Sequence, residues 1–219
     1  MKSTLAGLLL FAMSSCVFTA NVYASATQPW LFVKSEDGII LHKRPHSDGL
    51  IEIKAQMQVN TSYSGFLLLL EDTPNIPNWI ENASKSEVLV QLSSNENIVY
   101  TQFRAPWPAR DRDMVTYSKY EVGNGQFELK IEDASTYLAK NEDYLRITKV
   151  NALWVLQPLT SGTTHITYTA FADPGGILPD WLANKLSISA ALSTFQGLRA
   201  HLPNYQHLQH PNLPSSDTP

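Results

Sequence analysis

The six histidines are the residues whose spacing is easiest to test for chemistry. His42, His46 and His165 fall at separate strand positions, so none stands at the short interval from a second ligand that metal sites use. The other three, His201, His207 and His210, belong to a proline-rich terminal segment that is expected to trail in solvent. The sequence shows no Ser-His-Asp order, glycine-rich phosphate loop or zinc-finger spacing. We therefore expect no catalytic residue, no metal and no cofactor.

A stretch with two prolines in the middle of the chain combines an aromatic ring with a run of charges. Residues 103–113 read F-R-A-P-W-P-A-R-D-R-D. The two prolines bar a continuous strand, so they predict a stiff, extended loop that presents Trp107. Arg112 and Asp113 follow where the next strand begins. The sequence thus indicates a rigid elbow in which these two charged residues orient the strand and the loop.

Period-two alternation of apolar and polar residues predicts most of the chain to be strand. It is strictest at residues 51–60, and Gly123-Asn124-Gly125 is a strong hairpin turn. Short connections favour antiparallel pairing. We expect about eight strands and, near the start, two short helices over residues 62–70 and 76–82. The predicted strands are residues 39–44, 51–60, 88–92, 98–103, 114–122, 127–132, 144–156 and 163–172.

The C-terminal run from Asp173 to Leu202 predicts the one long helix. It opens with a Pro-Gly-Gly sequence, which interrupts regular secondary structure. Pro179 and Asp180 follow and favour a helix start. Apolar residues recur at helical spacing on one stripe, with Trp181 at its N-terminal end. The stripe contains Ile188, Ala191, Leu192, Phe195, Leu198 and Leu202. The expected fold class is α+β, a curved antiparallel sheet wrapped around this helix.

The composition is that of an ordinary globular protein, with 43% hydrophobic and 16% charged residues and a net charge of -4, which does not favour nucleic acid as a partner. Residues 1–26 have the pattern of a cleaved secretory signal peptide, a positive start, an apolar run and an Ala-x-Ala site. The remainder is expected to form one domain over residues 27–203, followed by a tail over 204–219. The only cysteine, Cys16, lies in the leader, and Met13 to Cys16 loosely resembles a lipobox. The localisation is therefore expected to be periplasmic or secreted, with a lipoprotein anchored at Cys16 as the alternative.

Three separated motifs in the right order resemble a known family. They are Trp30 with Asp37-Gly38-Ile39 and Arg44, the central R-A-P-W-P-A-R-D-R-D-M-V, and G-G-I-L-P-D-W-L-A-N-K before the last helix. Together with Trp79 they make the chain similar to the START domain, the StAR-related lipid-transfer family of the helix-grip, Bet v 1-like superfamily, as a bacterial secreted-type member. The resemblance implies a helix-grip fold with one internal tunnel for a lipid, and it implies a lid at the loop that carries Trp107.

The resemblance, together with strand alternation, selects candidate ligand-binding residues. In sterol-binding members an arginine lies six residues beyond the arginine of the Arg-Asp pair. That position here is Ser118, so sterol specificity is not implied. The full candidate set is Phe103, Trp107, Tyr117, Ser118, Trp154, Tyr168, Ile188, Leu192 and Phe195.

The sequence therefore predicts a non-catalytic carrier that binds, and can transfer, a lipid or another hydrophobic small molecule. A monomer with transient membrane contact is the family-like expectation. Two alternatives stay open. One is a cyclase or aromatase-like enzyme that uses the same cavity, for which Lys119, Glu121, Arg146 and His165 are the titratable candidates. The other is an interaction module of the cell envelope that would expose apolar patches.

Overall fold

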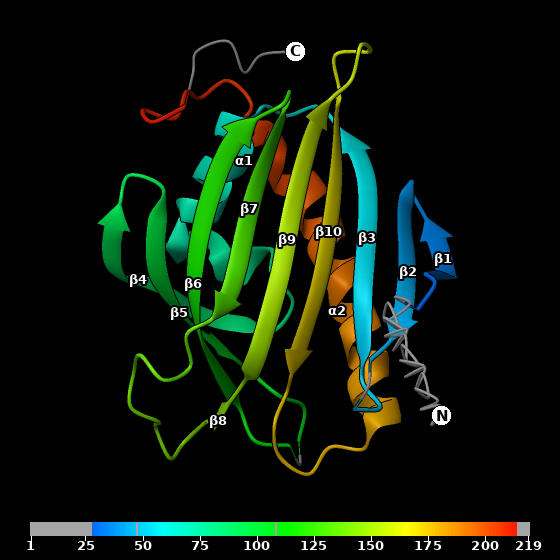
Figure 1. Ribbon diagram of the computed structural model, residues 1–219, viewed down its shortest axis with the longest axis vertical. Helices are drawn as coiled ribbons and strands as arrows, with labels where there is room; N and C mark the ends of the chain where they lie inside the picture. The colour runs from blue at the N-terminus through cyan, green and yellow to red at the C-terminus, as the bar shows by residue number, and fades with distance from the viewer. Residues whose placement is uncertain (1–27, 47, 108, 214–219) are drawn as a thin grey trace, which may run out of the picture.

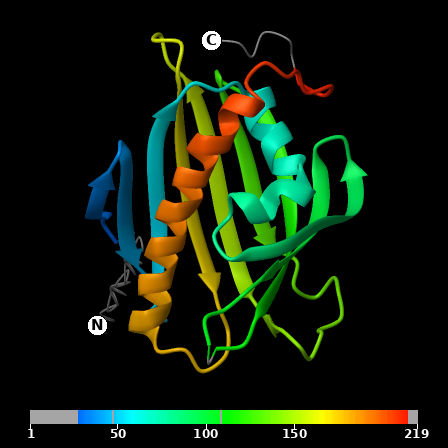
Figure 2. The same ribbon diagram turned by 180° about the vertical axis from the view of Figure 1, so that it is seen from behind.

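One large sheet and one long helix make up most of the fold. The computed structural model describes residues 28–46, 48–107 and 109–213. Figure 1 shows the sheet from one side with the long helix behind it, and Figure 2 shows the helix crossing the sheet diagonally. The strands are β1 (Leu31–Glu36), β2 (Ile39–Pro45), β3 (Ile51–Val59), β4 (Ala83–Ser93), β5 (Glu96–Phe103), β6 (Arg112–Gly123), β7 (Gln126–Asp133), β8 (Leu145–Arg146), β9 (Thr148–Pro158) and β10 (Thr164–Asp173). The helices are α1 (Tyr63–Glu71), α2 (Asp180–His201) and the short 3-10 helices η1 (Thr73–Asn78) and η2 (Leu202–Asn204).

The strand order is β1-β2-β3-β10-β9-β7-β6-β5-β4, and all neighbours in this path are antiparallel. The predicted curved sheet around a C-terminal helix is confirmed. The turn between β6 and β7 contains Asn124 and Gly125, both with positive φ, as the sequence predicts for a tight hairpin. One strand was not predicted, β1, and the short β8 is the first part of a predicted longer strand and pairs in parallel with the start of β6. The predicted strand 144–156 is divided in two close to Lys149, whose φ is 54°.

The alternation in β3 shows how the sheet acquires two different faces. Ile53, Ala55 and Met57 are buried, whereas Lys54 and Gln56 between them are partly exposed. The apolar set faces α2, which packs most closely against β3 and β2. We call the side of the sheet that faces α2 the inner face and the opposite side the outer face.

The two short helices follow β3 and lie beside α2 on the inner face (Figure 2). α1 begins where the Ser62 hydroxyl accepts a hydrogen bond from the Gly65 amide at 3.0 Å, a normal N-cap. Its predicted position is confirmed. The second helical segment starts earlier than predicted and is a 3-10 helix with Pro77 inside it. Proline removes an amide donor, so an α-helix is disfavoured there.

Helix α2 is anchored near its C-terminal end. A Cβ added at Gly197 would overlap the carbonyl oxygen of Trp79, so only glycine allows this close approach of α2 to the residue that follows η1. Ala191, Phe195, Leu198 and Leu202 from the predicted stripe are buried. Trp181 is 68% exposed, so its assignment to the buried stripe was wrong. Within the described residues, no helix has the length and apolarity needed to span a membrane.

The C-terminal segment does not trail in solvent as far as it is described. Leu213 is buried in the main core, and the Tyr205 hydroxyl donates a hydrogen bond to Asp72. The buried His210 contacts Glu71 through Nε2 at 2.9 Å, and the Asn212 amide donates to the Ser94 carbonyl at 3.2 Å. The segment therefore packs over one end of the sheet, next to α1 (Figure 1). We call this end the closed end.

Candidate functional site

Two rows of residues cross the middle of the inner face and differ in side-chain size. Strand register places Ser118, Ile131, Ala152, Ala170 and Ile53 side by side on β6, β7, β9, β10 and β3. One step closer to the closed end, the same strands contribute Tyr120, Leu129, Trp154, Tyr168 and Ala55. The first row contains three small side chains and the second contains three aromatic rings. The row of small side chains leaves the inner face unfilled unless α2 supplies the missing volume.

Several residues of the inner face and of α2, between the middle of the sheet and its end opposite the closed end, keep exposed surface. A solid core would bury such positions completely. Five of the predicted ligand-binding residues are among them, together with Ile131 and Ala170. The partly exposed set is Phe103, Ser118, Ile131, Tyr168, Ala170, Ile188 and Leu192. It gathers the helix residues and the strand residues on the two sides of one interior region.

An aromatic cluster closes this region toward the closed end. Trp154 stacks on Phe195 of α2 with ring centroids 5.7 Å apart, and Phe66 of α1 lies 5.3 Å from Trp154. Trp154 and Phe195 are 4% and 0% exposed. Both were predicted to line a cavity, and the structure places them in this tightly packed cluster at the limit of the partly exposed region.

Two loops meet at the opposite end of the sheet, which we call the mouth. They are residues 104–107 and 109–111 between β5 and β6 and residues 174–179 between β10 and α2 (Figures 1 and 2). The Asp111 carboxylate accepts a hydrogen bond from the Ala105 amide at 2.9 Å and so pins the first loop. Arg112 Nε donates to the Pro174 carbonyl at 3.0 Å and joins the two loops. Burial lowers the pKa of Arg112, yet its role here is the loop-orienting one that the sequence predicted.

Large apolar side chains are exposed at the mouth. Trp107 is 92% exposed, Trp181 at the start of α2 is 68% exposed, and Ile177 in the second loop is fully exposed. The sequence selected Trp107 from its flanking prolines but missed Ile177. An isoleucine between a Gly-Gly pair and a proline was the available signal, because such a loop holds no helix or strand in which to bury it.

Comparison with known proteins decides the family. A sequence model of the START domain matches residues 21–207. The chain belongs to the START family. PA1579 of Pseudomonas aeruginosa is 28% identical over 201 residues, which are 88% of this chain and 96% of that protein. The crystal structure of a STAR-related lipid transfer protein fragment from Xanthomonas axonopodis is 28% identical with a TM-score of 0.73, over 80% of this chain and 98% of that one.

A human START protein extends the comparison. START domain-containing protein 10 is 25% identical over 162 residues, which are 67% of this chain and 56% of the human protein. The START resemblance seen in the motifs is thus confirmed. The further statement that this is a secreted bacterial member stays a prediction, since its leader lies outside the described residues.

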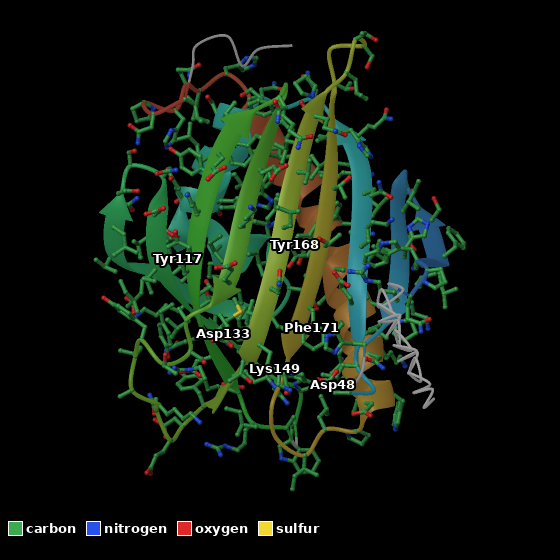
Figure 3. All side chains as sticks on the ribbon, in the orientation of Figure 1. Asp48, Tyr117, Asp133, Lys149, Tyr168 and Phe171 are labelled. Atoms are coloured by element: carbon green, nitrogen blue, oxygen red, sulfur yellow. The ribbon has the colours of Figure 1, made fainter. Side chains whose placement is uncertain are left out.

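One predicted site residue of this START domain lies on the wrong side of the sheet. Tyr117 alternates with Ser118 on β6 and faces outward, beside Glu132 of β7 (Figure 3). It borders a hollow of about 250 Å³ whose other walls are charged, Lys119, Glu121, Glu128, Lys130 and Glu132. The prediction that Tyr117 shares an interior site with Ser118 is therefore wrong.

The titratable residues that an enzyme would need are also not on the inner face. Lys119 pairs with Glu121 at 3.0 Å on the outer face, and His165 alternates with the inward Ile166 of β10. Arg146 forms a buried two-point pair with Asp113, both contacts being 2.8 Å. Its remaining donors bind the carbonyls of Ser135, Leu138 and Ala139, so it fixes the loop before β8. The hydrogen bonds that Arg146 donates to the Asp113 carboxylate raise the pKa of Arg146 and keep it charged.

A polar cluster on the outer face ties strands together near the mouth. Lys149 Nζ lies 3.1 Å from Asp173 and 3.4 Å from Asp48, and His46 stacks on Phe171 at 3.9 Å (Figure 3). Asp133 accepts hydrogen bonds from the backbone amides of Lys149 and Ser135, which lower its pKa. These contacts hold the chain between β2 and β3 against β9 and β10. In the described parts of the chain, no group of three or more His, Cys, Asp or Glu could hold a metal ion.

Proposed function

We propose that this START domain binds a lipid or another hydrophobic small molecule without catalysis, between α2 and the inner face on the mouth side of the aromatic cluster. The observation that carries the proposal is the set of inner-face residues that keep exposed surface in mid-sheet, above all Ser118, Tyr168 and Ala170. The set is apolar or uncharged. It suits a hydrocarbon chain, whose transfer out of water gains about 0.8 kcal/mol per buried methylene.

Family membership supports the same proposal. The Xanthomonas protein is described as a lipid transfer protein, and its fragment matches most of this chain. We extend the proposal to transfer between membranes. A carrier must take up and release its ligand at a lipid surface, and the exposed Trp107, Ile177 and Trp181 all lie at the mouth. Tryptophan side chains have an apolar body and a polar tip, so they favour the membrane interface. The exposed Arg104 and Arg110 near Trp107 favour contact with anionic headgroups.

We further propose that the protein acts outside the cytoplasm, as a monomer, after removal of residues 1–26. N-terminal sequencing of the protein isolated from the periplasm or medium tests this directly. A mature chain that begins near Thr27 is expected. A chain that keeps its leader in the cytoplasmic fraction would contradict it, and a lipid-modified Cys16 would establish the lipoprotein alternative.

Native mass spectrometry of the protein from its own host tests the ligand proposal. One bound lipid per chain is expected, and organic extraction would identify it. The matched variant is Ala170→Leu, which adds three carbon atoms to the row of small side chains. It should remain folded, as judged by circular dichroism, and carry no lipid. An empty wild-type protein that also fails to bind added lipids would overturn the proposal.

A further inference from the structure

Tyr168 stands at the boundary between the row of small side chains and the aromatic cluster. It lies near the middle of β10, as labelled in Figure 3, between Ala55 of β3 and Trp154 of β9. Its ring stacks on Trp154 at 4.1 Å and lies 6.3 Å from Phe195 of α2. The next inner-face residue of β10 toward the mouth is Ala170, whose side chain is small. Tyr168 is thus the aromatic residue of β10 that adjoins the proposed binding region.

The hydroxyl of Tyr168 is buried, and yet the side chain as a whole keeps some exposed surface. The hydroxyl lies within the fold, and this burial alone raises its pKa to about 12. Yet the side chain is only partly buried by its exposed area. Both facts hold if the exposed area opens onto the interior of the fold. A ligand that occupies this interior would therefore touch Tyr168.

The Tyr168 hydroxyl has no hydrogen-bond partner within the described residues. Other buried tyrosines of this protein do have one. Tyr120 donates to the Ser94 carbonyl at 3.1 Å, and Tyr63 donates to the Gly125 carbonyl at 3.1 Å. Burying a hydroxyl without a partner costs free energy, and phenylalanine would fill the same space without that cost. A bound molecule could supply the hydrogen-bond partner that the described residues do not give the Tyr168 hydroxyl.

We propose that the Tyr168 hydroxyl donates a hydrogen bond to an uncharged oxygen of the bound ligand. The cargo is then an amphiphile whose hydroxyl or carbonyl oxygen lies deep in the fold, against the aromatic cluster. This inference rests on the proposed function and names the chemistry of the ligand's inner end.

The neighbours of Tyr168 explain why that oxygen is uncharged. The two rows that surround it on β6, β7, β9, β10 and β3 contain only apolar, hydroxyl and aromatic side chains. A carboxylate or phosphate among them would lose its hydration without meeting a cation. Asn97 faces the same side one strand farther out, paired with Ser118, and its buried Oδ1 is likewise without a partner. Neutral polar groups thus face this region from two directions.

The Tyr168→Phe variant tests the proposal, with Tyr120→Phe as the matched control. In the full mature chain freed of lipid, Tyr168→Phe should melt at the same temperature as wild type or higher, because an unpaired hydroxyl is removed. Tyr120→Phe should melt lower, because it removes the hydrogen bond that the Tyr120 hydroxyl donates to the Ser94 carbonyl. A lower melting temperature for Tyr168→Phe would show that the hydroxyl has a partner within the protein, and it would overturn the proposal.

Binding of two probes of equal chain length completes the test. Hexadecanol and hexadecane are titrated by displacement of a fluorescent hydrophobic dye. Tyr168→Phe should weaken hexadecanol by roughly 2- to 12-fold, which corresponds to one net hydrogen bond, and leave hexadecane unchanged. Equal effects on both probes, or none on the alcohol, would reject the role of Tyr168 while keeping the carrier. If wild type binds neither probe, the proposed function fails, and this inference fails with it.

Discussion

The closed end and the mouth of this START domain differ in how tightly their side chains are packed and how much apolar surface they expose. At the closed end, α1, α2 and the C-terminal segment pack on Phe66, Trp154 and Phe195, and polar contacts such as His210 to Glu71 fasten the periphery. At the mouth, loops replace helices, and Trp107 and Ile177 point into solvent. We therefore expect the closed end to supply most of the stability and the mouth to give the proposed ligand access. A ligand that enters between α2 and the sheet would meet an aromatic wall and stop there.

Replacing one phenylalanine by alanine at each end should reveal the largest difference in stability between the closed end and the mouth. Phe195 is fully buried at the closed end, whereas Phe103 is partly exposed at the mouth. Phe195→Ala should lower the free energy of unfolding by about 3–5 kcal/mol, because it leaves a cavity in a packed cluster. Phe103→Ala should cost less than half as much. Urea unfolding curves measure both, and equal losses would show that the two ends are packed alike.

Alkaline titration tests the burial of Tyr168, which lies between the aromatic cluster and the row of small side chains. Because burial raises the folded-state pKa of Tyr168 to about 12, the unfolded chain loses this proton first as pH rises above about 10. The contribution to stability is complete below about pH 10 and is lost as pH rises toward 12. The wild-type loss from this group should be on the order of 2 kcal/mol at about pH 11.5. Tyr168→Phe should show a shallower decline in unfolding experiments from about pH 9 upward, and an identical decline would contradict the assignment.

Replacing two alanines on neighbouring strands by leucine tests for free space in the two rows that cross the inner face. Ala55 is 0% exposed beside Tyr168, whereas Ala170 keeps exposed surface in the row of small side chains. Ala55→Leu should cost about 1–3 kcal/mol because it overpacks a filled site. Ala170→Leu should cost less than about 1 kcal/mol. Thermal unfolding of the lipid-free variants compares them, and a larger loss for Ala170→Leu would place the free space elsewhere.

Substitutions at the mouth should have the smallest effect on the free energy of unfolding and a clear effect on membrane binding. Trp107→Ala removes a ring that is 92% exposed, so the free energy of unfolding should change by less than about 0.5 kcal/mol. Sedimentation with anionic lipid vesicles should nevertheless recover less of the variant than of wild type. The exposed Leu208 near the closed end is a control, since Leu208→Ala should sediment like wild type. Equal recovery of all three proteins would count against contact through the mouth.

Much of this fold could be predicted because its strands carry regular signals. β3 and β7 alternate strictly, the turn at Asn124 and Gly125 has a recognisable sequence, and α2 has both start signals and an apolar stripe. β1 was missed because Leu31 and Phe32 are consecutive apolar residues, both exposed, so no alternation appears. The packing of the C-terminal segment was missed because Leu213 and His210 find their partners far away in sequence.

The candidate site was predicted less completely than the fold, for a related reason. Thr116, Tyr117, Ser118 and Lys119 have no apolar period that would tell which residues of β6 point inward. The face is fixed only by register with β7, where Leu129 and Ile131 define the inner side. Trp181 fits the helical stripe by spacing, but it lies in the first turn of α2, beside the loop of the mouth. Spacing predicts which side of a helix is apolar and does not predict where along the helix the core ends.

The glycine at 197 has a mechanical consequence. Its backbone contact with Trp79 fixes α2 within the last two turns, whereas the first turn, from Asp180, follows a loop with two positive-φ glycines, Gly175 and Gly176. Helix α2 has 22 residues, and this close contact holds it near one end. A small rotation of α2 about its contact at Gly197 would move Asp180, at the far end of the helix, the most. Any rotation of α2 about this contact would therefore displace its end at the mouth more than its end in the aromatic cluster.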